Sequence, residues 1–152
     1  MVFLAARPSP HFAWSEATMT STGLRNIPDP ASMVRIILTA RLILEPLREA
    51  FGSLLPTSWY RSNAVNNAVG GASGSYHLAG SAVDLYSAVG ISAEDLAAWL
   101  YEQTWMPLAE VIVEEHTGHL HIALDTNGIL SPGKAKRKFL AYDGEDYRAW
   151  SP

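Results

Sequence analysis

The sequence contains no cysteine among its 152 residues. A disulfide framework, a zinc site built on thiolates and a thiol nucleophile are therefore excluded. Any metal site must use the side chains of histidine, aspartate or glutamate. The absence of cysteine says little about the compartment, because a chain without thiols functions in either redox setting.

Long apolar runs and an excess of basic residues are also missing. No window reaches the roughly 18 apolar residues of a membrane-spanning helix, so we expect no membrane insertion. The formal net charge of −4 argues against a nucleic-acid partner, because nucleic-acid-binding proteins present a basic face. The segment Met1–Arg7 has five apolar residues after Met1 and no basic residue before them, which does not fit a secretory signal peptide. We expect a protein made in the cytoplasm without a signal of its own.

The length and composition are those of a globular domain with a sizeable core. Hydrophobic residues make up 48% of the chain and charged residues 17%. We predict one domain over residues 1–152 and expect a monomer. Within it, residues 1–10, which contain two prolines, are predicted to form a flexible arm, and residues 126–152 a C-terminal hairpin extension.

The strongest helix signal begins at Asp29-Pro30, where Asp29 suits the N-cap and Pro30 the first helical position. Apolar residues then recur at alternating spacings of four and three as far as Phe51, which places them on one face. Pro46 lies inside this pattern and should kink the helix or split off its last turn. Shorter helices are predicted at His11–Glu16, with Ser15 as a possible N-cap, and after Ser92.

Four segments read as strands. They are Leu54–Tyr60, Ser81–Tyr86 and a hairpin formed by Ala109–Glu115 and His119–Asp125. Asn127-Gly128 predicts a turn. This order of elements predicts an α+β fold with a small, mainly antiparallel sheet and helices packed on one side.

The residues that carry chemistry gather around Ser75–Asp84 and His119–His121. His77 and Asp84 are followed by His119 and His121, which share one face of their strand because side chains two apart point the same way. Imidazole nitrogens and a carboxylate oxygen are zinc ligands, and a catalytic zinc site uses three protein ligands. From the residues alone, a metal site and hydrogen-bonded structural histidines both remain open.

Other polar residues have simple structural interpretations. Arg61 at a strand end is typical of a solvated side chain, and the basic run Lys134–Lys138 is typical of a solvated turn or strand edge.

Four segments resemble the zinc D-Ala-D-Ala carboxypeptidase family, peptidase M15, in the branch common in phages and bacteria. They are His11-Phe-Ala-Trp-Ser-Glu16; Leu44-Glu-Pro-Leu-Arg-Glu49; Trp59-Tyr-Arg-Ser62 with Asn66 and Val69-Gly-Gly71; and Ser75-x-His-x-x-Gly-x-Ala-x-Asp84 with His121-Ile122. The resemblance implies the small fold shared by these peptidases and the Hedgehog signalling domain.

The resemblance also implies roles for individual residues. It identifies His77, Asp84 and His121 as zinc ligands. It implies that Arg61 pairs with a substrate carboxylate or with the oxyanion, and it places Ser75 and Tyr76 beside the substrate.

One catalytic role stays open, that of the acid or base. Some members carry a glutamate or aspartate three residues before the last zinc ligand, but this chain has Gly118 there. Other members carry a histidine five residues before that ligand, which matches His116. His116 and His119 are therefore the candidates for proton transfer, ahead of Glu114 and Glu115.

The expected function is zinc-dependent hydrolysis of peptide bonds in bacterial peptidoglycan, as a D-Ala-D-Ala carboxypeptidase or an endopeptidase of cross-links or stem peptides. We expect it to act on the cell wall after release during phage lysis, or as part of a virion. The alternatives are a non-catalytic, zinc-containing cell-wall-binding module, which Gly118 favours, and a phage structural module.

Overall fold

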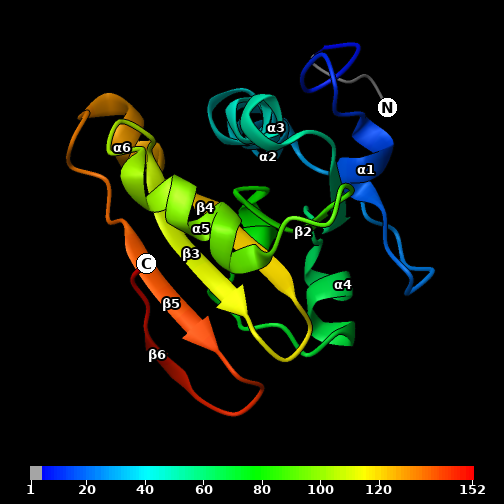
Figure 1. Cartoon of the computed structure of the whole chain (residues 1–152). Helices are drawn as coiled ribbons and strands as arrows, with labels where there is room; N and C mark the ends of the chain where they lie inside the picture. The colour runs from blue at the N-terminus through cyan, green and yellow to red at the C-terminus, as the bar shows by residue number, and fades with distance from the viewer. Residues whose placement is uncertain (1–4) are drawn as a thin grey trace.

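The computed structural model describes residues 5–152, which form an α+β arrangement around one six-stranded sheet (Figure 1). The strands are β1 (Leu54–Ser58), β2 (Ala82–Ser87), β3 (Leu108–Glu114), β4 (His119–Leu124), β5 (Lys138–Tyr142) and β6 (Tyr147–Ala149). The helices are α1 (Trp14–Thr18), α2 (Pro30–Thr39), the π-helical η1 (Ala40–Leu44), α3 (Glu45–Phe51), α4 (Asn63–Ala68), the 3₁₀ turn η2 (Tyr76–Ala79), α5 (Ala93–Glu102) and α6 (Thr126–Leu130).

The sheet has the order β1-β2-β4-β3-β5-β6. Every neighbouring pair is antiparallel except β3 and β5, which are parallel. The predicted α+β class and mainly antiparallel sheet are therefore confirmed. Of the part of the chain that is described, no helix is long and apolar enough to cross a bilayer.

The main helix begins where the sequence predicts. The Asp29 carboxylate accepts a hydrogen bond from Ser32 N at 2.7 Å, which satisfies one of the free amides of the first turn. Pro46 has no amide hydrogen, so the α-helical hydrogen-bond ladder cannot continue unbroken through it. The chain responds with the wider turn η1, in which Glu45 N donates to Ala40 O, before α3 follows.

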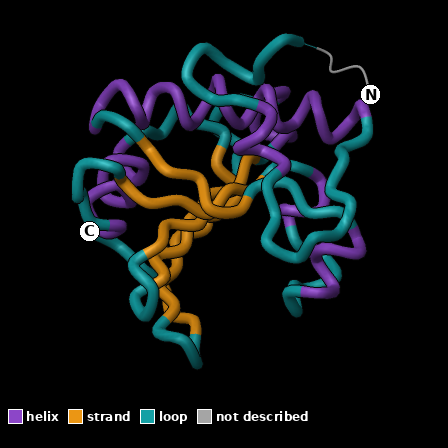
Figure 2. The backbone as a smooth tube through the Cα atoms, turned by 90° about the vertical axis from the view of Figure 1, so that its right-hand side faces the viewer, coloured by secondary structure: helices purple, strands orange, loops and turns teal. Residues whose placement is uncertain are grey.

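One face of the sheet carries the core. Val83 and Leu85 of β2 and Leu120 and Ile122 of β4 are fully buried there, and α2 and α5 pack against this side. Figure 2 shows the strands nearly edge-on, with the helices gathered around them. Side chains alternate between the two faces, so Asp84 of β2 points to the opposite face.

Two local predictions are wrong. Ser15 does not cap the first helix, because α1 already begins at Trp14; instead the Glu16 carboxylate accepts from Ala13 N at 2.7 Å. Asn127-Gly128 is part of the short helix α6 and not a turn between strands. The Asp125 carboxylate caps this helix by accepting from Asn127 N at 3.0 Å, a side-chain effect that the dipeptide signal does not include.

The N-terminal segment was predicted to be a flexible arm, and residues 1–4 of it lie outside the described residues. In residues 5–10, Pro8 and Ser9 are buried, and Ser9 pairs with Phe12 in an isolated bridge. Arg41 Nε donates to Pro8 O at 3.2 Å. This part of the segment therefore packs on the main helix.

The C-terminal segment adds β5 and β6 to the far side of the sheet, where Tyr142 pairs with Tyr147. Arg137, in the basic run, donates to the carbonyl oxygens of Leu100 and Tyr101 at 3.1 and 2.8 Å. Those carbonyls belong to the last turn of α5, where helical amides run out, and only that of Leu100 also accepts from the backbone, from Gln103 N at 3.2 Å. Arg137 therefore ties the C-terminal segment to α5.

Candidate metal centre and cleft

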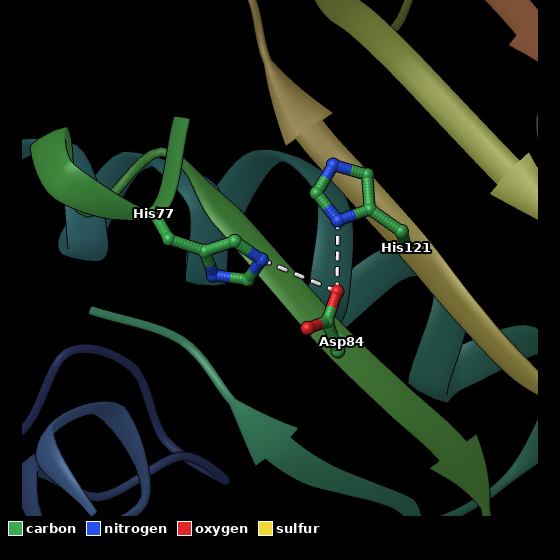
Figure 3. A group of neighbouring side chains, drawn as sticks. All are labelled: His77, Asp84 and His121. Atoms are coloured by element: carbon green, nitrogen blue, oxygen red, sulfur yellow. Dashed lines mark hydrogen bonds and ion pairs between the residues drawn. The ribbon is translucent and has the colours of Figure 1, made fainter. Parts of the chain in front are cut away.

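Three of the predicted site residues converge on the open face of the sheet. His77 comes from η2, Asp84 from β2 and His121 from β4, and one ligand atom of each lies within 4.8 Å of the other two (Figure 3). Asp84 and His121 are directly opposite each other in the β2–β4 register. The fold therefore forms a group of side chains that could bind one metal ion.

Each of the three side chains is oriented by a second contact. The Trp59 carbonyl lies 2.6 Å from His77 Nδ1, and Arg61 Nη2 donates to Asp84 Oδ2 at 2.9 Å. Glu110 Oε1 lies 3.4 Å from His121 Nε2, an ion-pair distance without hydrogen-bond alignment. Metal-binding histidines are commonly held in this way, with the second ring nitrogen facing a carbonyl or a carboxylate.

The arrangement of lone pairs around Asp84 fits a bound cation. A carbonyl oxygen can only accept, so His77 must carry its hydrogen on Nδ1. Neutral His77 then directs the lone pair of Nε2 toward Asp84 Oδ1, another acceptor, only 3.2 Å away. On the other side, His121 Nδ1 lies 2.7 Å from the same oxygen. A divalent cation shared by the three atoms removes the repulsion between acceptors, so these residues fit a metal ion.

The pKa values of these three residues are set by burial and by the charges of their neighbours. Burial lowers the pKa of His77, although the Asp84 carboxylate opposes this. Burial works to raise the pKa of Asp84, but the contacts from His121 and His77 outweigh it and hold the value far below the usual range. For His121, burial works to lower the pKa, but Asp84 and Glu110 raise it to about 9. Without a metal, a proton on His121 is the positive charge that the Asp84 carboxylate attracts.

The group opens into a cleft of about 380 Å³. The residues around it come from β2, β3, β4, β6 and η2, from the loop before η2 and from the segment after β1. They are Arg61, Ala72, Gly74, Ser75, Tyr76, His77, Asp84, Glu110, Ile112, Glu114, His121 and Tyr147.

The loop wall of this cleft is fixed by a buried side chain. Asn66 donates from Nδ2 to Gly71 O at 3.1 Å and to Ala72 O at 3.0 Å. Its side chain is 1% exposed. The loop between α4 and η2 is therefore held from inside.

The residues predicted to face the substrate all line the cleft. Arg61 is positioned by Ser58 Oγ, to which its Nε donates at 2.8 Å. Ser75 Oγ accepts from His77 N at 3.3 Å and so caps the turn that carries His77. The Tyr76 hydroxyl accepts from Lys136 Nζ at 3.1 Å.

The two histidines predicted to transfer protons do not line the cleft. His119 stacks on Tyr86 with ring centroids 4.0 Å apart, and its Nδ1 lies 2.8 Å from Thr117 Oγ1. His116 packs edge-to-face on Tyr142, and its Nδ1 lies 3.7 Å from Glu114 Oε2. His116 is thus next to the cleft through Glu114, whereas His119 has its partners outside it.

Two glutamates, Glu110 and Glu114, line the cleft, and Glu110 was not predicted from the sequence. Glu110 and Glu114 alternate along β3 with Ile112 between them, so all three side chains share the face that carries His121. Burial, and next the Asp84 charge, raise the pKa of Glu114. The period-two spacing along the predicted strand was the signal that could have revealed both carboxylates together.

The backbone conformation of Gly118 explains why no acidic residue stands three positions before His121. Its φ is +77°, in the turn between β3 and β4. An L-residue with a side chain is strained in this left-handed conformation. This form of the hairpin therefore disfavours a glutamate or aspartate at the position, and the glutamates that line the cleft come from β3.

An α+β domain whose open sheet face gathers two imidazoles and a carboxylate belongs to the class of proteins that can bind a single divalent metal. The family described as Peptidase M15 matches residues 10–123 of the chain. The chain therefore belongs to the peptidase M15 family, whose members are metal-dependent peptidases, and it is a metallopeptidase that acts on a peptide substrate. A comparison with curated protein sequences gives no match.

Of the four segments that carry the family resemblance, the first two support the site and the other two supply its residues. The first two contact each other, because Glu45 accepts from His11 N at 2.9 Å and lies 2.7 Å from its Nδ1. Phe12 then packs edge-to-face on Trp59, with ring centroids 6.1 Å apart. Since the Trp59 carbonyl holds His77, these segments position the other two, which supply the site.

Proposed function

We propose that this chain is a zinc-dependent peptidase that hydrolyses peptide bonds of bacterial peptidoglycan, as a D-Ala-D-Ala carboxypeptidase or as an endopeptidase of stem peptides or cross-links. The observation that carries the proposal is the convergence of His77, Asp84 and His121 at one cleft in a chain of the peptidase M15 family. Two imidazoles and one carboxylate are a donor set typical of catalytic zinc.

His77 Nε2, one oxygen of Asp84 and His121 Nδ1 would hold the ion, because these are the atoms that face one another. A bound zinc ion supplies Lewis-acid polarisation of the peptide carbonyl and a water molecule of lowered pKa. The contacts from Trp59, Arg61 and Glu110 keep the three ligands in place, so little reorganisation accompanies binding.

Arg61 has two roles in this proposal. It orients Asp84 through Nη2, and it places a permanent positive charge at the edge of the cleft. A guanidinium group suits a substrate carboxylate or the oxyanion that develops as the carbonyl is attacked. Ser75 and Tyr76 form the wall beside it and contact the substrate backbone.

Glu114 is the residue that we assign to proton transfer. It lines the cleft, whereas His116 lies behind it at 3.7 Å and His119 is engaged with Tyr86. The Glu114 carboxylate takes a proton from the attacking water as the carbon–oxygen bond forms, and it returns the proton to the leaving amine as the carbon–nitrogen bond breaks. His116 positions Glu114.

The test is digestion of purified peptidoglycan by the folded protein, with the products weighed by mass spectrometry. We expect release of peptides or D-alanine, loss of this activity with a chelator, and its return with zinc. His121→Ala should remove both activity and stoichiometric zinc, while the control His119→Ala, which changes a histidine whose partners lie outside the cleft, should keep them. Equal turnover by His121→Ala and the wild type would rule out the proposed mechanism.

The non-catalytic alternative is favoured by Gly118, because some family members carry a glutamate or aspartate at this position. Among the described residues, the group that could bind a metal has three members, and His119 is bonded elsewhere. An open position on the metal is what an enzyme needs and a structural site lacks. The turnover assay separates the two, and an active enzyme would fit release during phage lysis or attachment to a virion.

A further inference from the structure

A second hollow continues the cleft across the open face of the sheet. It has a volume of about 260 Å³ and is lined by Glu110, Ile112, Lys138, Leu140 and Tyr147. Three of these residues, Glu110, Ile112 and Tyr147, also line the cleft that contains the metal ligands. The two hollows therefore share a wall and form one groove.

The strand register explains this continuity. His121 lies opposite Ile112, and Ile112 lies opposite Leu140, so one row of side chains runs from the metal ligands to β5. In the adjacent row, Glu110 lies opposite Lys138. Paired residues point to the same face, so both rows border the groove.

The far half of the groove comes from outside the family match. The match ends at residue 123, whereas β5 (Lys138–Tyr142) and β6 (Tyr147–Ala149) come after it. β5 is added to β3 by parallel pairing and β6 to β5 by antiparallel pairing, and both strands bring side chains to the groove. The far half is thus a feature of this chain beyond the part that defines its family.

The chemistry of the far half fits a peptide with a carboxylate. Lys138 is exposed and is the one cation among the residues that line this hollow. Leu140 and the 59%-exposed ring of Tyr147 offer apolar surface beside it. Glu110, in the wall that the two halves share, and Glu114, in the near half, repel a carboxylate, so the Lys138 ammonium group marks where a negative group of the substrate is accepted.

We propose that the β5–β6 hairpin forms a subsite for the substrate segment on the amino-terminal side of the cleaved bond, and that Lys138 binds a free carboxylate in that segment. This rests on the proposed peptidase function. Arg61 lies toward β1, on the other side of the metal ligands, so it serves the carboxyl-terminal side. Neighbouring strands are about 4.8 Å apart, so β5 lies about 10 Å from β4, which an extended peptide spans with about three residues.

The experiment compares two synthetic peptides that end in D-Ala-D-Ala and differ at the third residue before the cleaved bond, where one has a free carboxylate and the other a carboxamide. We expect the wild type to cleave the acid peptide with a kcat/KM up to about 5-fold higher, since an exposed ion pair contributes modestly. Lys138→Gln should abolish the preference by lowering the rate on the acid peptide alone. Lys138→Glu should reverse it.

Lys134→Gln is the matched control, because Lys134 belongs to the same basic run but lines neither hollow. It should keep the preference of the wild type. A preference that persists in Lys138→Gln, an equal loss on both peptides, or a wild type that does not distinguish them would overturn the subsite while leaving the peptidase function intact. If the wild type cleaved neither of the two peptides and did not cleave peptidoglycan, the peptidase function would be refuted and the subsite with it.

Discussion

Gly80 offers a quantitative test of how the fold positions His77. Gly80 has φ +75° and follows the turn that carries the histidine, and its amide donates to His77 O at 3.1 Å. A Cβ atom on Gly80 would lie 2.9 Å from Ser32 O and 2.9 Å from Ile36 Cγ1, both in α2. The Ile36 side chain can rotate, but the Ser32 carbonyl is helix backbone and cannot move alone.

The expected cost of Gly80→Ala has two parts. The left-handed conformation costs about 1–2 kcal/mol for alanine. Forcing a methyl group into a filled space typically costs about 1–3 kcal/mol. We therefore expect a loss of about 2–5 kcal/mol in the free energy of unfolding, measured by urea denaturation.

Gly90→Ala is the matched control, because Gly90 has φ +83° but no atom within 4 Å of the added Cβ. Both substitutions restrict the unfolded chain equally, so this contribution cancels between them. The difference between the two variants isolates the clash with α2, about 1–3 kcal/mol. Metal affinity should fall in Gly80→Ala alone, because relieving the clash displaces the turn before it. Equal destabilisation by the two substitutions would show that Gly80 is not packed against α2 in this way.

Three further predictions concern glutamates. Glu110→Gln should weaken metal binding about 10- to 100-fold in a chelator competition, because the orienting charge at His121 is lost; unchanged affinity would contradict the supporting role. Glu114→Gln should lower kcat by about 100-fold or more with metal content unchanged, measured on a defined peptide; a normal kcat would exclude it from proton transfer. Burial works to raise the pKa of Glu45, but the neighbouring Ser9 side chain and the contacts from His11 bring it below its ordinary value of 4.5. Its stabilising contribution is therefore complete above pH 4.5 and is lost as the pH falls toward the lower folded value. Glu45→Gln should flatten the stability profile in that acidic window, as followed by urea denaturation at several pH values; an unchanged profile would contradict this.

The local features of the fold could be predicted from the sequence because their causes are local. The cap at Asp29, the break near Pro46 and the alternation that directs Leu120 to the core and His121 to the opposite face of the sheet each depend on a few neighbouring residues. The same holds for the hairpin between β3 and β4. The ligand set was a prediction from family resemblance, and the structure brings its members together.

The remaining features depend on contacts between distant residues. Nothing near Lys138 in the sequence indicates that β5 pairs in parallel with β3, so the basic run was interpreted as a solvated turn or strand edge. Nothing near Arg137 indicates that it binds the end of α5. Glu110 was overlooked because its role depends on His121 in the adjacent strand and not on its own neighbours.

The position of the metal ligands is set mainly by the hydrophobic core. Asp84 meets His121 only in the observed register of β2 and β4, which also pairs Val83 with Ile122 and Leu85 with Leu120. A slip of one residue would turn every side chain of a strand to the other face, exposing the apolar set as it removed the ligand. Fully burying each such aliphatic side chain contributes about 1.5–3 kcal/mol, so the core strongly disfavours the slipped register. The ligands are therefore brought together by packing on the opposite face of the sheet, and the chain can present them to a metal ion already in place.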